Sequence, residues 1–493
     1  MNLTKTDFLQ YLNCSNSLWL LKNKPEVFKK YKGEKSLFLE KLIREGYEVE
    51  EYVEKLFPKA QDLGDMNPIG IQDFLSKNLG KFFQATFETE KGAFARVDML
   101  EVHPDKTISL YEIKSSTYDD KKGIKSYNKK HFKDLAFQKY VLEKDGYIVK
   151  DMNLIYLDKT FIKDEEINPE KLLHIGNVTE KINEIFDVTV LEIESALEYI
   201  KKKEINENLC SCLENTRTNH CETFLYFNKN IPEHSIYELN NIRAAKIIKL
   251  KDLGIESISD IPSDFDLSDY QILQKEAVEN NLPLINEENI KTALNKLKFP
   301  LYFFDYETLP FAVPKIDGYG PHAQVPTQYS LHVLEKNGNI QHFEYLTEKL
   351  ENPKKLIETM KGQIGNVGTL ISWYASFEKT RNKEMAKMFP EYEDFLMDIN
   401  SRTYDLMDIF KKDYIDKNFE GSMSIKKVQP VLVPDLSYKV LDVQSGTMAV
   451  DTTERLFLEM IDEEEIKNTR KALLKYCELD TLAMVRIYEV LKK

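Results

Sequence analysis

The chain of 493 residues has no long apolar run, and this absence excludes one class of protein. No stretch approaches the roughly 20 apolar residues that a helix needs to span a bilayer. The first residues, Met1 to Asp7, also lack a basic region followed by an apolar core, which is the pattern of a secretory signal peptide. We therefore expect a cytoplasmic protein that does not interact with membranes.

Cysteine is also scarce, with five residues in the whole chain. Disulfides are rare in the cytoplasm, where clustered cysteines more often bind a metal. Three of the five lie within twelve residues, from Cys210 to Cys221. The distribution therefore predicts a metal site rather than a disulfide framework.

Positive charge is not in excess, because 68 Lys and Arg residues stand against 82 Asp and Glu residues, a net charge of −14. This balance gives no support to a nucleic-acid partner, although such binding depends on local patches rather than on total charge. The contents of 42% hydrophobic and 30% charged residues are typical of a globular protein. The length predicts roughly two to four domains.

The first candidate site lies in two predicted strands, Phe94–Leu100 and Ile108–Lys114. Side chains alternate across a strand, so Glu112 and Lys114 share a face that Asp98 reaches from the neighbouring strand. Two carboxylates of this kind hold Mg²⁺ or Mn²⁺, which lowers the pKa of a bound water, while a lysine orients that water. The pattern indicates metal-assisted hydrolysis of a phosphodiester.

A helix that begins at Asp134 follows these strands and places Gln138 near the same site. The segment before it is locally basic and suits contacts with phosphate, although loop lysines are usually just solvated. Its lysines are Lys121, Lys122, Lys125, Lys129, Lys130 and Lys133.

Most of residues 1–225 resembles the RecB-like PD-(D/E)XK nucleases, in particular their iron–sulfur branch. The resemblance is carried by Arg96-Val97-Asp98, by Glu112-Ile113-Lys114-Ser115-Ser116 and by the helix with Gln138. It implies a nuclease fold in which Asp98 and Glu112 bind the metal and Lys114 and Gln138 assist catalysis. The branch also has a metal-binding residue on its first long helix, where Glu50 is nearest by position.

The same branch carries one cysteine before the nuclease core and three after it, as Cys14, Cys210, Cys212 and Cys221 do here. The resemblance implies a [4Fe–4S] cluster that joins the two ends of the domain. The C-x-C spacing is tighter than the usual C-x-x-C, and His220 is a rival ligand. Zinc held by the same residues is therefore the alternative.

Residues 226–298 lack clustered catalytic residues and are predicted to form a helical linker. Within them, Leu250–Pro262 resembles a helix-hairpin-helix turn, whose backbone amides contact nucleic-acid phosphates. Packing of helices between domains explains this segment equally well.

The second candidate site begins in the predicted buried strand Leu301–Thr308, where Asp305 and Glu307 share one face. Two carboxylates on one face of an apolar strand repel each other unless a cation lies between them. Near the end of the chain, Tyr476 and Asp480 are four residues apart and lie on one face of a helix. Farther upstream, Lys426 lies in a predicted loop that enters a helix.

Residues 299–493 resemble the DEDD exonucleases of the DnaQ type, which have a ribonuclease H-like mixed-sheet fold. The resemblance implies that Asp305, Glu307 and Asp480 bind Mg²⁺ or Mn²⁺, and Tyr476 marks the DEDDy subgroup, in which it orients the attacking water. The second aspartate of the family corresponds here to Glu378, with Asp405 as the alternative ligand.

The combination resembles a bacterial family that joins a RecB-like nuclease to an exonuclease domain, over nearly the whole chain. We therefore expect an α/β protein that is a metal-dependent DNA nuclease with two sites, acting in DNA repair or in defence against foreign DNA. The resemblance favours DNA over RNA as substrate. The alternatives are a nucleic-acid-binding or assembly protein with one or both sites inactive, which Glu378 favours, and an RNA-processing exonuclease.

Overall fold

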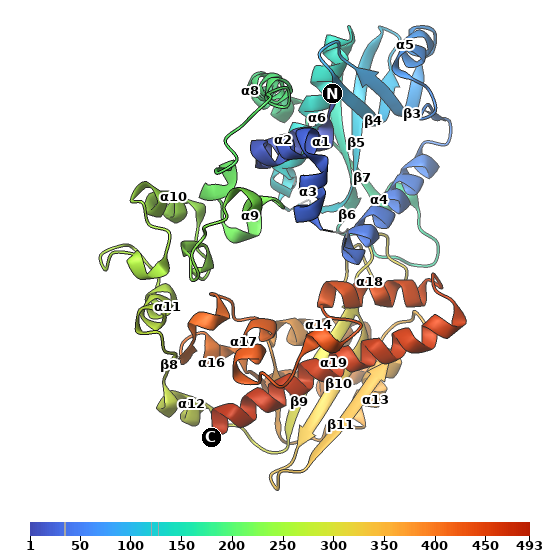
Figure 1. Cartoon of the computed structure of the whole chain (residues 1–493). Coiled ribbons are helices and arrows are strands. Elements are labelled where there is room, and N and C mark those ends of the chain that lie inside the picture. Colours follow the sequence, from blue (N-terminus) through green and yellow to red (C-terminus); the bar gives the residue numbers. More distant parts are fainter. Residues whose placement is uncertain (34–35, 120, 127) are drawn as a thin grey trace. The chain divides into compact units, whose positions relative to one another are not determined.

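A computed structural model describes residues 1–33, 36–119, 121–126 and 128–493. The chain forms two compact units, both with helices and sheets, which confirms the expected α/β class (Figure 1). Unit 1 comprises Met1–Lys35, Leu42–Asn230 and Phe311–His322, and unit 2 comprises Ser36–Lys41, Ile231–Pro310 and Ala323–Lys493. Most of the predicted linker thus belongs to unit 2. No helix of the described residues has the length and apolar character needed to cross a membrane.

Unit 1 contains a mixed sheet of seven strands in the order β2-β3-β4-β5-β6-β7, with β1 paired to β4. The strands are β1 (Leu3–Thr4), β2 (Gln61–Asp62), β3 (Gly80–Glu88), β4 (Ala93–Val102), β5 (Thr107–Tyr118), β6 (Ile148–Asp158) and β7 (Leu173–Asn177). Strands β3, β4 and β5 pair in antiparallel fashion, whereas β5 and β6 are parallel. Both strands predicted for the first site are present, as β4 and β5.

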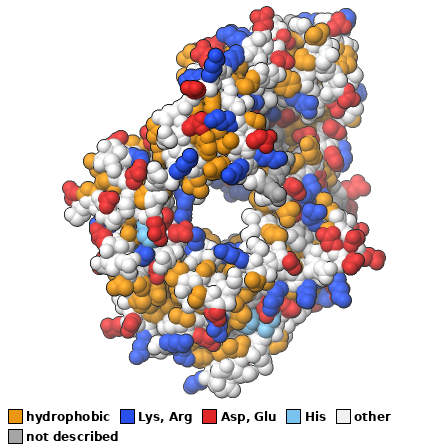
Figure 2. Space-filling view, viewed as in Figure 1, with side chains coloured by type: hydrophobic (Ala, Val, Ile, Leu, Met, Phe, Trp, Pro, Cys, Tyr) orange, Lys and Arg blue, Asp and Glu red, His pale blue; other side chains and the backbone are white. Residues whose placement is uncertain are grey.

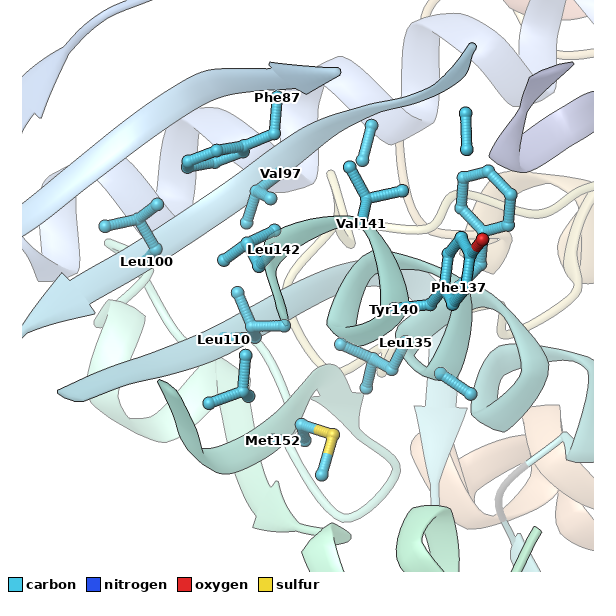
Figure 3. Packing of buried hydrophobic residues seen from close by; sticks show 14 of the residues in the cluster. Phe87, Val97, Leu100, Leu110, Leu135, Phe137, Tyr140, Val141, Leu142 and Met152 are labelled. Atoms are coloured by element: carbon cyan, nitrogen blue, oxygen red, sulfur yellow. The ribbon is translucent and has the colours of Figure 1, made fainter. Parts of the chain in front are cut away.

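The helices of unit 1 are α1 (Lys5–Asn13), α2 (Ser15–Asn23), α3 (Pro25–Lys32), α4 (Leu37–Leu56, in unit 1 from Leu42), α5 (Pro68–Lys77), α6 (Lys129–Lys144), α7 (Pro169–Leu172), α8 (Thr179–Tyr199) and α9 (Phe224–Phe227). Several of these helices, among them α5, α6 and α8, pack against this sheet. Helix α6 connects the parallel strands β5 and β6, and Phe137, Tyr140 and Val141 on it are buried against the strands (Figure 3). Truncation of a core phenylalanine such as Phe137 costs about 3–5 kcal/mol, so this helix is held firmly.

Residues 311–322 join unit 1 although they follow a strand of unit 2 in the sequence. The backbone N–H of Ala312 donates to Glu45 Oε1 at 2.8 Å, and Ala312 and Val313 are fully buried in the core of unit 1. At Gly320 an added Cβ would lie 2.6 Å from the carbonyl oxygen of Phe161, so only glycine fits this approach. The segment is therefore an integral part of unit 1.

Unit 2 contains a five-stranded mixed sheet in the order β11-β10-β9-β12-β13 and a small sheet of β8 and β14. The strands are β8 (Leu284–Ile285), β9 (Leu301–Leu309), β10 (Val325–Leu334), β11 (Ile340–Leu346), β12 (Thr369–Ser372), β13 (Thr403–Asp405) and β14 (Tyr414–Ile415). The helices are α10 (Ala244–Asp252), α11 (Asp269–Asn280), α12 (Glu287–Leu294), α13 (Lys354–Lys361), α14 (Ser376–Met388), α15 (Glu393–Ser401), α16 (Met407–Phe410), α17 (Ile425–Leu432), α18 (Gly446–Phe457) and α19 (Glu463–Lys492).

Strand β9 divides the core of unit 2 into two layers, because its side chains alternate between the faces of the sheet. Leu301 and Phe303 pack in the layer that contains the end of α19, whereas Phe304 and Tyr306 pack in the layer on the other face. In this otherwise buried strand Asp305 and Glu307 are the two partly exposed positions. The alternation explains why both acids lie on the α19 side of the sheet.

Charged side chains of both signs cover the surface. On the face shown in Figure 2, acidic and basic side chains are interspersed rather than gathered into areas of one sign. The net charge of −14 is therefore not concentrated in one patch of that face.

Candidate functional sites

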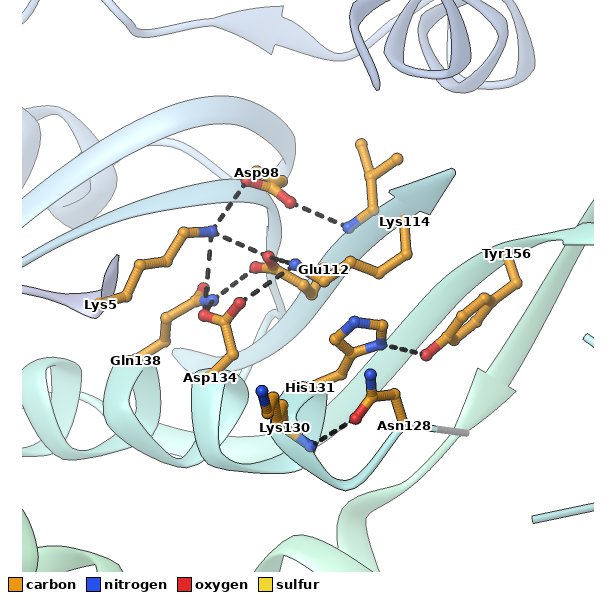
Figure 4. A network of polar contacts seen from close by, with 11 residues as sticks. Lys5, Asp98, Glu112, Lys114, Asn128, Lys130, His131, Asp134, Gln138 and Tyr156 are labelled. Atoms are coloured by element: carbon orange, nitrogen blue, oxygen red, sulfur yellow. Dashed lines mark hydrogen bonds and ion pairs between the residues drawn. The ribbon is translucent and has the colours of Figure 1, made fainter. Parts of the chain in front are cut away.

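The four residues predicted for the first site come together at the edges of β4, β5 and α6 in unit 1 (Figure 4). Strands β4 and β5 are paired as far as Met99 and Tyr111. Beyond that point Asp98 Oδ2 accepts the backbone N–H of Ile113 at 2.9 Å, so a carboxylate replaces the next bond of the ladder. This leaves the Asp98 side chain beside Glu112. We call Lys5, Asp98, Glu112, Lys114, Asp134 and Gln138 site 1.

Glu112 is the most contacted carboxylate of site 1 and is 1% exposed. It accepts hydrogen bonds from Lys5 Nζ at 2.8 Å, from Gln138 Nε2 at 2.5 Å and from Lys114 Nζ. Burial disfavours its charge, but Lys5 and Lys114 outweigh burial and hold the pKa of Glu112 well below its usual range. Glu112 is therefore an anion in the folded protein.

The pKa of Asp98 shifts in the opposite direction to that of Glu112. Burial, together with repulsion from Glu112, raises the pKa of Asp98 to about 7. A divalent cation between the two carboxylates would reverse this shift and keep both ionised. The amide oxygen Oε1 of Gln138 is also buried, without a hydrogen-bond partner in the part of the chain that the structure describes. An unpaired amide oxygen and two neighbouring carboxyl groups fit a hydrated Mg²⁺ or Mn²⁺ ion.

Two members of site 1 had no assigned role in the sequence. Lys5 Nζ lies 3.4 Å from Asp98 Oδ1 and 3.9 Å from Asp134 Oδ1, in addition to its bond with Glu112. Asp134 is 3% exposed and lies 3.1 Å from Lys114 Nζ. Asp134 is four residues before Gln138, and this helical spacing was a usable signal. Lys5 is 93 residues from Asp98, and the local sequence held no signal that it would join this site.

Two further sequence predictions concern the surroundings of site 1. Burial raises the pKa of Glu50 on α4, and its carboxylate interacts electrostatically with Lys5 and Glu112. Of the predicted basic segment, Lys133 forms an ion pair with Glu192 of α8 at 2.5 Å instead of facing site 1.

Four cysteines of unit 1, Cys14, Cys210, Cys212 and Cys221, form what we call the cysteine centre. All four are buried, and their sulfur atoms lie within 4.8 Å of one another. Hydrogen bonds from the other three thiols lower the pKa of Cys14, and the bond from Cys210 has the largest effect. The nearby thiol of Cys14 in turn raises the pKa of Cys212 and of Cys221. The group is therefore a buried set of thiols that can bind a metal.

The spacing of the sulfurs bears on the identity of that metal. Zinc–sulfur bonds of about 2.3 Å in a tetrahedron separate the sulfurs by roughly 3.8 Å, so the observed compact group fits one zinc ion. In a [4Fe–4S] cluster each thiolate binds a different iron, which requires the four sulfurs to spread apart. His220 is occupied elsewhere, since its ring stacks on Phe224 and its Nε2 lies 3.2 Å from the carbonyl oxygen of Asn215.

The predicted residues of the second site line a single pocket of about 320 Å³ in unit 2. Strand β9 supplies Asp305 and Glu307, one turn of α19 supplies Tyr476 and Asp480, and the first turn of α14 supplies Glu378. We call these five residues and their surroundings the acid pocket.

The acid pocket contains more carboxyl groups than its own cations can keep ionised. Burial and repulsion from Asp480 raise the pKa of Asp305 well above its usual range, and the same two causes raise the pKa of Glu307 to about 8. Burial raises the pKa of Asp480 to about 6 and that of Glu378 to about 8. A hard divalent cation with oxygen ligands would relieve this repulsion, so the residues fit Mg²⁺ or Mn²⁺.

Glu378 and Asp405, the alternatives for one ligand, have different surroundings. Glu378 is 3% exposed, and its Oε2 has no hydrogen-bond partner among the described residues. Asp405 Oδ1 accepts the backbone N–H groups of Tyr374 and Met407 at 3.0 and 3.1 Å. Glu378 lines the acid pocket and has a free oxygen, whereas Asp405 bonds to the backbone beside it.

Lys426 also lines the acid pocket, and Tyr438 contacts one of its acids without lining it. Lys426 Nζ donates to the hydroxyl oxygen of Tyr476 at 2.7 Å, and Tyr438 donates its hydroxyl to Asp480 Oδ1 at 2.5 Å. Sequence reasoning had left Lys426 in a loop near a helix start and had missed Tyr438. The thiol of Cys477 lies 4.0 Å from Asp305 Oδ2, and burial raises its pKa well above the usual range, so it stays protonated.

Comparisons with known proteins cover parts of the chain. Residues 302–424 match a family model described as a domain of unknown function, DUF2779. An uncharacterized protein of Mycoplasma pneumoniae, the MG366 homolog, is 32% identical over 217 residues, or 40% of this chain and 33% of that protein. The uncharacterized protein UU173 of Ureaplasma parvum is 27% identical over 295 residues, or 54% of this chain and 42% of that protein. The chain thus spans between a third and a half of the length of these relatives.

Among solved structures, the crystal structure of SSO0001 is similar to 41% of this chain and to 85% of its own chain, at 12% identity and a TM-score of 0.18. At that score the similarity supports no argument about fold or function. The names of the two relatives state no activity.

Proposed function

We propose that the protein is a metal-dependent nuclease with two sites that hydrolyse phosphodiesters, a RecB-like site in unit 1 and a DnaQ-type exonuclease site in unit 2. The observation that carries the proposal is the convergence in one pocket of Asp305, Glu307, Glu378, Tyr476 and Asp480, five residues from three elements. A set of buried acids with raised pKa values and one free carboxylate oxygen is suited to cations that bind phosphate.

Divalent cations held by Asp305, Glu307 and Asp480 would supply an activated water and stabilise the leaving 3′ oxygen. Tyr476 orients that water by hydrogen bond, because burial and the surrounding acids raise its pKa and exclude a role as a strong base. Lys426 fixes the Tyr476 hydroxyl by donating to its oxygen, and the same hydroxyl is hydrogen-bonded to Asp480, which holds it beside the proposed cations. Tyr438 fixes Asp480 in the same way.

In site 1, Asp98 and Glu112 would hold a cation that activates water. Lys114 is positioned by two carboxylates, Glu112 and Asp134, and is available to orient the water or to neutralise charge on a phosphate. Gln138 fixes the second oxygen of Glu112. The resemblance to nucleases favours DNA as the substrate of both sites, in repair or in defence against foreign DNA.

The cysteine centre would tie the start of unit 1 to residues 210–221. The resemblance implies a [4Fe–4S] cluster there, whereas the compact sulfurs fit zinc. A brown anaerobic preparation that bleaches on reduction supports iron. A colourless preparation in which elemental analysis finds zinc and no iron supports a zinc ion in the cysteine centre.

The test is cleavage of end-labelled single-stranded and double-stranded DNA, and of RNA of the same sequence, with Mg²⁺ or Mn²⁺. We expect Asp305→Asn to abolish stepwise removal of nucleotides from an end and Lys114→Ala to abolish cleavage by site 1. Exposed residues of the same kinds, Asp408→Asn and Lys77→Ala, are the matched controls. If the double variant Asp305→Asn, Lys114→Ala digests DNA as fast as wild type, the proposal is wrong.

One observation favours a second candidate, a nucleic-acid-binding protein without cleavage. The ammonium group of Lys5 already lies among three carboxylates of site 1, where a catalytic cation would bind. Metal-independent binding of DNA with no cleavage by either site would support this candidate. Degradation of RNA in preference to DNA would support an RNA-processing exonuclease.

A further inference from the structure

Unit 2 contains a second group of ligand-type side chains, outside the acid pocket. His332 on β10 and His342 on β11 are direct partners across the two strands, and the centroids of their rings are 4.4 Å apart. Glu478 on α19 lies beside them. One ligand atom from each of the three residues falls within 4.8 Å of the other two.

Hydroxyl groups hold both imidazoles in place. Thr481 Oγ1 lies 2.8 Å from His332 Nδ1, and Ser330 Oγ lies 2.9 Å from His342 Nε2. The two hydroxyls are themselves 2.7 Å apart and hydrogen-bonded. These bonds use one nitrogen of each ring and leave His332 Nε2 and His342 Nδ1 as the nitrogens that can bind a ligand. Fixing a metal-binding histidine through its other nitrogen is the usual arrangement around metal sites.

Glu478 is able to join the imidazoles as a third ligand. It is partly buried, and its Oε2 lies 2.8 Å from Lys475 Nζ, on a side chain that is 55% exposed. An ion pair of this exposure contributes little to stability, so a metal can displace the lysine at small cost. Glu478 lies between Tyr476 and Asp480 in the sequence, but the acid pocket is lined by those two residues and not by Glu478.

We propose that His332, His342 and Glu478 bind one transition-metal ion, with zinc as the best match. Two imidazole nitrogens and one carboxylate oxygen are a zinc ligand set, in which a water takes the fourth position. Imidazole selects zinc and its neighbours over Mg²⁺ and Mn²⁺, which prefer the oxygens of the acid pocket. The bound ion would join the β10–β11 hairpin to α19, the helix that carries Tyr476 and Asp480. It would thereby stabilise the wall of the acid pocket.

The test measures zinc per chain in the full-length protein after stripping with chelator, reloading with Zn²⁺ and removal of excess ion. We compare wild type with His342→Gln and with Glu478→Gln, which keeps the shape of the side chain. His103→Gln, a histidine of unit 1 that bonds to Ser109, is the matched control. The cysteine centre is intact in all four proteins, so its metal content cancels in the comparison.

We expect both variants to contain one zinc fewer than wild type and the control to contain the same number. Zinc should also raise the thermal midpoint of wild type and control above that of the stripped proteins by more than it does for the variants. Equal zinc content in wild type, His342→Gln and Glu478→Gln would overturn the proposal. The acid-pocket variant Asp305→Asn should keep the zinc even if nuclease activity is never observed, so this test is independent of the proposed function.

Discussion

Site 1 and the acid pocket solve the same electrostatic problem in opposite ways. Site 1 surrounds three carboxylates with two lysines of the chain, Lys5 and Lys114, which neutralise most of its charge. The acid pocket brings four acids together, with Lys426 near Asp305, Glu307 and Asp480 and with Arg381 near Glu378, and these cations do not offset burial and mutual repulsion. Site 1 is therefore stable without metal, whereas the acid pocket gains most when a cation arrives. The difference teaches that metal dependence should be read from charge balance and not from the number of acids.

The largest expected effect tests the internal pairing of site 1. Glu112→Gln removes the anion but keeps the shape, so Lys5 and Lys114 lose their shared buried partner. We expect a loss of about 3–5 kcal/mol in the free energy of unfolding of unit 1, because unpaired buried charges are costly. Hydrogen exchange of the α6 amides measures this loss. The partly exposed pair of Lys81 and Glu101 is the control, and Glu101→Gln should cost less than about 1 kcal/mol.

If Glu112→Gln destabilises α6 no more than Glu101→Gln does, the lysines are not held by Glu112 and the comparison between the two sites fails.

The next effect concerns pH and has opposite signs for the two glutamates of the acid pocket and for Glu112 of site 1. In the acid pocket, the pKa values of Glu307 and Glu378 are raised to about 8, against about 4.3 for a free glutamate. The folded state therefore binds more protons than the unfolded state between these values, and the stability of unit 2 falls as pH rises from about 4.3 to 8. In site 1 the pKa of Glu112 is lowered. The ionised Glu112 therefore stabilises the folded state fully above pH of about 4.3, and this stabilisation is lost as the pH falls below that value.

We expect the protection of the α19 amides against exchange, relative to unprotected amides at the same pH, to fall in metal-free protein from pH 5 to pH 8, and the thermal midpoint to fall by roughly 5 °C. Mn²⁺ at pH 8 should reverse most of this change. An α19 that is equally protected at both pH values, with and without Mn²⁺, would show that the pocket carries no excess charge.

A smaller effect is expected when the internal cation of site 1 is removed. Lys5→Met leaves Asp98, Glu112 and Asp134 with Lys114 alone, which makes site 1 resemble the acid pocket. We expect a loss of about 1–3 kcal/mol without metal, and recovery of most of it on addition of Mn²⁺. Thermal unfolding with and without Mn²⁺ measures both. Wild type should show a smaller stabilisation by Mn²⁺, and an equal response in the two proteins would contradict the role given to Lys5.

The smallest effect separates Tyr438 from Tyr476 in the acid pocket. Tyr438→Phe removes the hydroxyl that donates to Asp480, at a cost of about 1 kcal/mol, and should weaken Mn²⁺ binding without abolishing cleavage. Tyr476→Phe should weaken Mn²⁺ binding less, because its hydrogen bond affects Asp480 less than that of Tyr438 does, and should slow cleavage, because Tyr476 is proposed to act on water. Calorimetric titration with Mn²⁺, together with cleavage rates at saturating Mn²⁺, distinguishes the two. Identical behaviour of both variants would remove the distinction.

The parts of these sites that sequence reasoning identified are those that local periodicity controls. The alternation of a strand places Asp305 with Glu307, and the turn of a helix places Tyr476 with Asp480. The partners of these residues come from distant segments of the chain. Lys5 contacts Asp98 and Tyr438 contacts Asp480, and neither the helical nor the strand periodicity predicts such a pair. A single sequence also holds no signal that residues 311–322 belong to unit 1.

The contribution of residues 311–322 to unit 1 has a consequence for the order of events during translation. Asn230 is synthesised about 90 residues before this segment, so at about 5–20 residues per second unit 1 waits roughly 5–20 s for its last piece. Until then the apolar surface that Ala312 and Val313 cover is open to water and to other chains. The nascent protein therefore reaches a complete unit 1 only after the first strand of the five-stranded sheet has left the ribosome.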